Sequence, residues 1–405
     1  MVVVSTVLGK EKNTYRVEEF DESLKPTGKF TEISNEFEPK TFQLEDIVYA
    51  HNRNVVVVGR VYEFREGKKP KEKYLHFVNY SIRIYDPNGK QINEIKTEVN
   101  GKWVTSTKVI ETKDKALLLA GFYSANRQDR TVDGMIVQRI DPASGEVLST
   151  NEHPIDRALL TDASAVLPED EGTMDKAEKK EREKFEKEKT RGDGFSAYKM
   201  FRNIYYSEDG GAVILAENYY HTVRVHNYYQ TGFNGSPGKF VETVYSIYEC
   251  GDLMMCKLDS AAEISWIKVL PKYQREVLED NNSSLVSSLI YFDYEKRPFY
   301  AGFGSMQVNN SLLIFLNDSQ QNRDVLQAGK KPRMISYYGK SHCYVVTLDM
   351  ESGKYTRKFF FDNAEIPTAM PRLGSVVGNE MYITGKDDRV LGKSKVAVGK
   401  ITVKK

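Results

Sequence analysis

The sequence lacks the short motifs that mark many enzymes. None of its 405 residues form a phosphate-binding G-x-x-x-x-G-K-[ST] loop, a G-x-S-x-G nucleophile turn or an H-E-x-x-H zinc helix. The residue pattern therefore marks no catalytic residue and no cofactor-binding residue. A site of another kind has to be sought from the organisation of the chain.

Cysteine is scarce. The three cysteines, Cys250, Cys256 and Cys343, leave at least one thiol unpaired. On an extended strand the first two lie roughly 20 Å apart, which is beyond disulfide reach. We interpret Cys256 and Cys343 as small buried hydrophobes. No cysteine spacing suits zinc, and His221 and His226 point to opposite faces of a strand, so no metal site is predicted.

An excess of charge of one sign is also absent, with 58 basic and 57 acidic side chains. A balanced chain offers no general attraction to nucleic acid or to an anionic membrane. The opening MVVVSTVLGKEKN is too short to span a membrane and lacks the basic region and cleavage site of a secretion signal. A soluble chain, a truncated chain and an exported protein without its leader all fit this start.

What the sequence does have is a repeated hairpin. Residues 252–270, DLMMCKLDSAAEISWIKVL, form an alternating strand, an Asp, a polar turn and a second strand. The same unit recurs with other residues, and its aspartates are Asp21, Asp86, Asp141, Asp259 and Asp349. An Asp at the end of a strand accepts bonds from backbone N–H groups of the turn. We interpret these aspartates as turn builders, followed by glycines that adopt positive φ at Gly28, Gly89, Gly145 and Gly353.

The repeat predicts an all-β chain folded as a β-propeller of about six blades, with seven as the alternative. Apolar strands that run into Gly59 and Gly121 are expected to be buried on both faces. Trp266 is expected to be largely buried beside Ile264. Because radial repetition leaves sheet edges to cover, we expect pairing of the N- and C-terminal strands to close residues 1–405 into a single domain.

One segment departs from the strand pattern. Residues 169–191 contain nine acidic and eight basic side chains in 23 positions, several spaced i,i+4 with the acid first. This predicts a charged helical or disordered insertion at about 168–192, and the only helix longer than two turns. A docking helix for a partner is the alternative, although no apolar stripe runs along the segment.

The second half of the chain also carries a resemblance. The residues that carry it are Glu217, Asn218, Tyr219 and Tyr220, then Trp266, Lys268 and Pro271, and finally Asn317 and Asp318. In this order the pattern resembles a family of uncharacterised propeller-like proteins of Bacteroidota, best over residues 194–405. The turn glycine of that family is absent after Asp259, where Ala261 and Ala262 stand. The resemblance implies export to the periplasm or cell envelope and an unassigned role.

The aromatic-rich stretch 217–248 is the candidate binding surface. Its glycines and Pro237 are expected to lift Tyr228, Tyr229 and Phe233 onto an exposed turn, with packing on a neighbouring blade as the alternative. Glu217, Tyr219 and Tyr220 end a strand where it meets a propeller face. We expect a non-catalytic binding or scaffolding propeller whose partner is another envelope protein or a glycan. The alternative is a glycan-acting hydrolase or lyase with a carboxylate site on one face.

Overall fold

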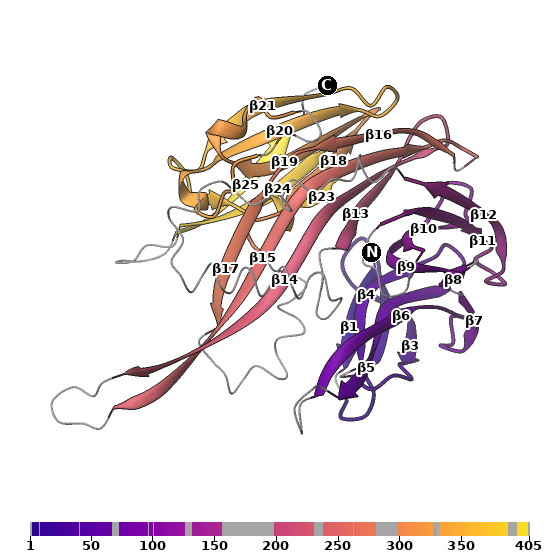
Figure 1. The fold of residues 1–405 in the computed structure, drawn as a ribbon. Helices are drawn as coiled ribbons and strands as arrows, with labels where there is room; N and C mark the ends of the chain where they lie inside the picture. Colours follow the sequence, from indigo (N-terminus) through magenta and orange to yellow (C-terminus); the bar gives the residue numbers. More distant parts are fainter. Residues whose placement is uncertain are drawn as a thin grey trace. The chain divides into compact units, whose positions relative to one another are not determined.

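The structure is a computed structural model of the 405-residue chain. It describes residues 2–7, 9–39, 41–66, 73–95, 97–99, 101–125, 132–155, 198–230, 238–261, 263–280, 298–326, 330, 332–387 and 395–403. The strands fall into two compact units, β1 to β12 and β13 to β25. Figure 1 labels the strands, and each unit is described by itself.

The first unit consists of three antiparallel sheets. Sheet 1 contains β1 (Val2–Val7), β2 (Thr14–Phe20) and β3 (Pro26–Ser34). Sheet 2 contains β4 (Phe42–Tyr49), β5 (Val55–Glu66), β6 (Lys73–Tyr85) and β7 (Gln91–Ile95). Sheet 3 contains β8 (Glu98–Val99), β9 (Lys102–Glu111), β10 (Leu117–Ser124), β11 (Gly134–Ile140) and β12 (Val147–Pro154).

The second unit repeats this plan. Sheet 4 contains β13 (Tyr198–Tyr206), β14 (Ala212–Gln230), β15 (Lys239–Leu258) and β16 (Ile264–Leu270), and β17 (Gln274–Asp280) also pairs with β15. Sheet 5 contains β18 (Phe303–Val308), β19 (Ser311–Asp318), β20 (His342–Asp349) and β21 (Tyr355–Asp362). Sheet 6 contains β22 (Thr368–Ala369), β23 (Ser375–Val377), β24 (Glu380–Asp387) and β25 (Lys395–Thr402).

These six small sheets are the blades of a six-bladed β-propeller, which confirms the predicted all-β class. Helical structure within the described ranges consists of the single 3₁₀ turns η3 (Gln320–Asn322), η4 (Tyr338–Lys340) and η5 (Pro371–Leu373). The predicted insertion at 168–192 lies outside the described residues. In the described pairing β1 joins β2 and β25 joins β24, so closure of a single domain by the two terminal strands stays a prediction.

The aspartates of the repeated hairpin act as turn builders, as predicted. The carboxylate of Asp86 accepts the N–H groups of Asn88 and Lys90, both at 2.9 Å. Asp21 and Asp259 accept the equivalent N–H groups two and four residues on, while Asp141 and Asp349 bind a serine three residues on. The predicted glycines adopt positive φ, from 67° to 80°, at Gly28, Gly89, Gly145 and Gly353. Each hairpin is therefore shaped by its own local sequence.

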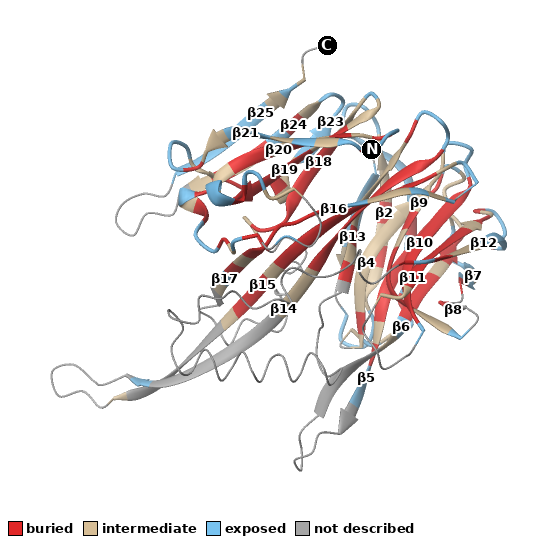
Figure 2. Ribbon diagram, turned by 45° about the horizontal axis from the view of Figure 1, so that its top comes forward, coloured by how far each residue is buried: buried red, intermediate tan, exposed pale blue. Residues whose placement is uncertain are grey.

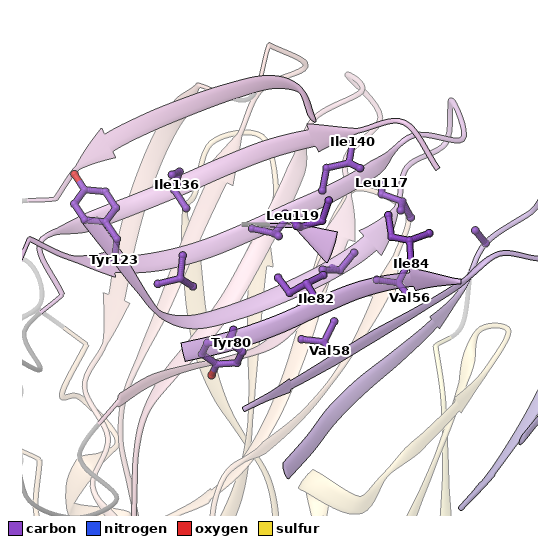
Figure 3. Close-up of a cluster of buried hydrophobic side chains, with 14 residues drawn as sticks. Val56, Val58, Tyr80, Ile82, Ile84, Leu117, Leu119, Tyr123, Ile136 and Ile140 are labelled. Carbon is purple, nitrogen blue, oxygen red and sulfur yellow. The ribbon is translucent and has the colours of Figure 1, made fainter. Parts of the chain in front are cut away.

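The hydrophobic core lies between consecutive sheets within each unit. Figure 3 shows the side chains of Val56, Val58, Ile82 and Ile84 from sheet 2 beside those of Leu117, Leu119 and Ile136 from sheet 3. Equivalent clusters join sheets 1 and 2, sheets 4 and 5, and sheets 5 and 6. Figure 2 shows burial concentrated in the middle strands, and all eight residues of β10 are buried, as expected for a strand covered on both faces.

Turns of one sheet also pack on the sheet that precedes it. A Cβ added at Gly353 would lie 2.7 Å from the Trp266 ring, so the glycine allows the β20–β21 turn to rest on β16. Trp266 donates its ring N–H to the carbonyl of Glu351 at 3.1 Å. Its side chain is partly buried at the edge of the cluster between sheets 4 and 5, with less burial than the sequence suggested. The turn glycines therefore serve the contact between blades as well as the turn itself.

Candidate functional site

The candidate site is built around Glu217, which lies inside β14 rather than at the end of a strand as the sequence suggested, because β14 continues to Gln230. The strand register shifts at Arg202 in β13 and at Asn218 in β14. Such bulges bend a strand and change the direction of a side chain. Here they accompany a contact between Arg202 and Glu217, whose Nε and Oε1 atoms lie 2.5 Å apart. The bulges thus place a cation on the carboxylate that the sequence singled out.

A second cation reaches Glu217 from the segment before β17. The Nζ atom of Lys272 lies 2.7 Å from Oε2 of Glu217, and both side chains are 0% exposed. Burial alone raises the pKa of Glu217, but the charges of Arg202 and Lys272 outweigh that effect and lower the pKa from 4.5 to about 2. Glu217 is therefore an ionised carboxylate that is fully engaged inside the protein.

Alternate residues of β17 hold the chain that leads into β18. Gln274 donates its side-chain N–H to the carbonyl of Asn317 at 2.7 Å and accepts the N–H of Gly302 at 2.8 Å. The buried carboxyl of Glu276 accepts the N–H groups of Phe299, Tyr300 and Ala301 at 2.7 to 2.9 Å. Burial raises the pKa of Glu276 more than these bonds lower it. Gln274 and Glu276 therefore fix backbone segments in place through hydrogen bonds.

The Asn-Asp pair of the resemblance ends β19 and links neighbouring segments. Asn317 donates to the carbonyl of Ala369 at 2.8 Å and accepts a hydrogen bond from Asn363 at 2.9 Å. Asp318 forms an ion pair with Arg357 at 2.6 Å, and both side chains are 0% exposed. Asn317 therefore joins sheet 5 to β22 of sheet 6, whereas the Asp318–Arg357 pair lies within sheet 5. Their role in the structure is architectural.

Two tyrosines and two arginines beside this buried network are partly exposed. We call Arg202, Tyr219, Tyr300 and Arg372 the tyrosine–arginine cluster. The guanidinium of Arg202 lies 4.9 Å from the centre of the Tyr219 ring, and Tyr300 stacks on Tyr338 with 5.6 Å between ring centres. Both tyrosines pack on one small apolar group formed by Cys250, Ala301, Ile335 and Tyr338. The cluster therefore gathers side chains from sheet 4 and from the segments that enter sheets 5 and 6.

Arg372 completes the cluster from η5. It donates to the carbonyl of Pro298 at 3.0 Å, and its side chain crosses Gly302, where an added Cβ would lie 2.8 Å from Cδ of Arg372. The pKa of Arg372 is lowered, first by burial and then by the nearby charge of Arg202. The charge of Glu217 acts in the opposite direction and raises the pKa of both Arg202 and Arg372.

The remaining predicted residues lie along the β14–β15 hairpin. Tyr220 is partly buried and pairs in register with Glu249. We call the backbone segments 225–230 and 239–244 the arm. Here β14 and β15 pair with each other, while β13 no longer pairs with β14 and only Asp280 of β17 still pairs with β15. At its end Tyr229 is 55% exposed, and its ring lies against Gly238. The side chain of Tyr228 and the whole of Phe233 lie outside the described residues.

The cysteines and His221 lie in the protein interior or pack on other side chains. Cys250, Cys256 and Cys343 are free and buried, and burial raises the pKa of each thiol to about 12. His221 stacks on Tyr248 with 4.3 Å between ring centres. Among the residues described, no group of three or more His, Cys, Asp or Glu side chains could hold a metal ion.

Comparison with known proteins assigns neither a family nor an activity to the chain. No protein-family model and no curated protein sequence matches the chain. A protein of unknown function from Bacteroides caccae is similar in structure at 12% identity, with a TM-score of 0.26 over 90% of this chain and 95% of that one. In the part of the chain described, no helix has the length and apolar character needed to cross a membrane.

Two enzymes are also similar in structure. A Synechocystis apocarotenoid oxygenase is 8% identical, with a TM-score of 0.34 over 93% of this chain and 67% of that one. An α-L-arabinofuranosidase from Clostridium thermocellum is 9% identical, with a TM-score of 0.27 over 89% of this chain and 95% of that one. At these scores and identities, neither likeness assigns an activity to this chain.

Proposed function

We propose that the chain is a non-catalytic binding or scaffolding propeller that works at the periplasmic side of the cell envelope. Its partner is a glycan or another envelope protein. The envelope location rests on the resemblance carried by Glu217 to Tyr220, Trp266 and the Asn317–Asp318 pair. The binding role rests on the geometry of the candidate site.

The observation that carries the proposal is the contrast between buried carboxylates and the partly exposed rings and guanidiniums beside them. Glu217 is 0% exposed and Glu276 is 4% exposed, and each is bonded within the protein. A glycosidase of the usual kind needs two carboxyl groups that face the substrate, one protonated and one ionised. The tyrosine–arginine cluster, in contrast, is partly exposed and suits contact with a ligand.

The hydrolase alternative has one observation in its favour. The raised pKa of Glu276 is the direction that a general acid requires. However, both oxygens of Glu276 accept backbone N–H groups, and a protonated oxygen would have to give up such a bond. The geometry therefore favours a structural role for Glu276, in which it holds backbone N–H groups, over a role as general acid.

The deciding experiment follows binding and product release in one sample. The purified chain is titrated with envelope polysaccharides, and the mixture is then analysed for new reducing ends and for unsaturated sugars. We expect the chain to bind the polysaccharide and to release neither new reducing ends nor unsaturated sugars. Release of product by the wild type that is lost in Glu276→Gln would refute the proposal and support the hydrolase.

The arm is the second surface to test, for a protein partner. Tyr229→Ala and a triple Tyr228→Ala, Tyr229→Ala, Phe233→Ala variant are expected to weaken capture of envelope proteins by cross-linking, because Tyr229 is 55% exposed and exposed rings concentrate binding energy. Tyr337→Ala is the matched control, since Tyr337 is 68% exposed and lies before η4, far from the arm in sequence. Unchanged capture by the triple variant would remove the arm from the proposal.

A further inference from the structure

Residues 332–336, which we call the edge segment, lie beside the start of β17. Ile335 is joined to that strand by a parallel bridge. The N–H of Ile335 donates to the carbonyl of Tyr273 at 2.9 Å, and its own carbonyl accepts the N–H of Arg275 at 2.8 Å. The edge segment therefore adds a short extended strand to sheet 4 in the second unit.

One side of the edge segment is bonded and the other is open. In an extended chain, the N–H and C=O groups of successive residues point to opposite sides. Asn322 binds both backbone groups of Arg333 at 2.7 Å, on the side where the chain at β17 binds those of Ile335. In the part of the chain that the structure describes, the backbone groups of Met334 and Ser336 form no hydrogen bond. Because buried backbone groups are almost always paired, and Ser336 is exposed, this side is available to a further strand.

The side chains that flank the edge segment are basic. In a chain where the two signs of charge balance, residues 325–341 include no Asp or Glu and four bases, Lys330, Lys331, Arg333 and Lys340. Lys330, Arg333 and Lys340 are exposed and form no ion pair within the described ranges. Arg333 donates to the side-chain oxygen of Gln321 at 2.5 Å, and Nζ of Lys340 lies 5.9 Å from the centre of the Tyr337 ring. The open side is therefore bordered by positive charge without a counter-charge.

These two observations together select a kind of partner. Open backbone groups at a sheet edge pair with the backbone of an extended peptide, and exposed bases favour a peptide with acidic side chains. An acidic polysaccharide or an anionic lipid surface offers the charge without the backbone. A second copy of this chain offers a backbone edge but carries the same bases, which repel each other.

Resting on the binding role proposed above, we infer that the edge segment binds an extended acidic segment of a partner protein by strand addition. The backbone of that segment pairs with Met334 and Ser336, and its carboxylates contact Arg333 and Lys340. Its sequence is expected to alternate Asp or Glu with β-branched residues, because these favour an extended chain.

The first experiment measures the affinity of the full chain for synthetic peptides by calorimetry. The probe is a capped octapeptide in which glutamate alternates with threonine, and its control has glutamine in place of glutamate. Two further versions carry N-methyl groups on either the glutamates or the threonines, so each lacks the N–H donors of one edge. We expect the acidic peptide to bind about ten-fold or more tightly than the glutamine peptide, and at least one N-methylated version to lose about ten-fold or more.

Hydrogen exchange of the same complex, read by mass spectrometry, locates the contact. In the free chain the N–H groups of Met334 and Ser336 are expected to exchange fast, because they have no hydrogen bond to break. Those of Arg333 and Ile335 are bonded and are expected to exchange more slowly. Binding of the acidic peptide is expected to slow exchange at Met334 and Ser336 about ten-fold or more.

Five variants then test backbone and charge separately. Ser336→Pro removes one open N–H group and is expected to weaken binding about ten-fold or more, whereas Ser336→Ala keeps that group and is expected to bind as the wild type does. Lys340→Gln is expected to weaken binding about three-fold or more and to reduce its salt dependence. Lys354→Gln, in the exposed turn at the opposite end of β20, and Tyr337→Ala, which keeps the backbone and both bases, are expected to bind normally. Thermal melting identifies any variant that has lost its fold.

The outcomes separate this inference from the proposed function. No binding of the acidic peptide, equal binding of the glutamine peptide, full affinity of both N-methylated versions, unchanged exchange at Met334 and Ser336, or full affinity in folded Ser336→Pro would each overturn the inference and leave a binding propeller in place. Polygalacturonate or phosphatidylglycerol vesicles that bind as tightly as the peptide would overturn it too, because charge alone would then explain binding. Release of sugar products would overturn only the proposed function. Charge-dependent binding that is weakened by N-methylation and by Ser336→Pro supports strand addition.

Discussion

Replacing Lys272 with methionine tests whether the buried ion pair with Glu217 stabilises the second unit. Both side chains are 0% exposed, and 2.7 Å separates Nζ of Lys272 from Oε2 of Glu217. Removing one partner of a buried pair costs about 3 to 5 kcal/mol, because the other charge stays buried. Arg202 remains beside Glu217, so we expect Lys272→Met to lower the free energy of unfolding by about 2 to 3 kcal/mol.

The pKa of Glu217 links this stability to pH. Its net shift from 4.5 to about 2 corresponds to roughly 3 kcal/mol, which is what remains after burial has opposed the two cations. Because the folded-state pKa lies below the unfolded value, this stability is present above about pH 4.5 and is lost as the pH falls toward 2. The difference between wild type and Lys272→Met is therefore expected to shrink over that range.

The assay is urea unfolding followed by fluorescence. The chain has two tryptophans, Trp103 in the first unit and Trp266 in the second, so a Trp103→Phe background makes the signal specific to the second unit. Lys268→Met is the control, since Lys268 is exposed on β16, and it is expected to cost less than about 0.5 kcal/mol. A Lys272→Met cost below about 1 kcal/mol, or one that is the same at pH 7 and pH 3, would refute the reasoning.

Three further predictions concern packing. Gly353→Ala is expected to lower the free energy of unfolding by about 2 to 3 kcal/mol, and Gly28→Ala by only about 1 kcal/mol. Both glycines have positive φ, but only Gly353 lies against the side chain of Trp266. Equal losses for the two variants in chemical unfolding would contradict this contact. Trp266→Ala is expected to cost about 2 to 3 kcal/mol, at or below the low end for a core aromatic because the ring is partly buried, and a loss under about 1 kcal/mol would show that it rests on the surface. The three thiols are expected to resist alkylation at pH 8 until urea unfolds the chain, since all are buried with pKa values of about 12; fast labelling of the native chain, followed by mass spectrometry, would contradict their burial.

The class of fold was readable from sequence because its signals are local. Asp86 binds N–H groups two and four residues on, and Gly89 supplies the positive φ of the same turn, so one short stretch contains both cause and effect. Repetition of that stretch then points to repeated sheets. The partial burial of Trp266 was not readable, because it depends on a turn of the next sheet, almost 90 residues further along the chain.

The candidate site was readable only in part. In the sequence Glu217 and Tyr219 stood out as a carboxylate and an aromatic ring two residues apart on one strand. The partner of Glu217, Lys272, and the charge that acts on Tyr219, Arg372, come from distant segments. The bulge at Arg202, which turns its side chain to Glu217, has no sequence mark such as a glycine. The polar alternation of Lys272, Gln274 and Glu276 was the one signal that could have indicated a buried polar face.

The residues that carried the family resemblance explain why it could not indicate a function. Glu217 is neutralised by two cations, Asn317 bonds the backbone before η5, and Asp318 is paired with a buried arginine. Buried polar groups need these partners whatever the protein binds, since an unpaired buried charge is costly. A pattern made of such residues therefore reports how buried polar groups are paired within and between the sheets.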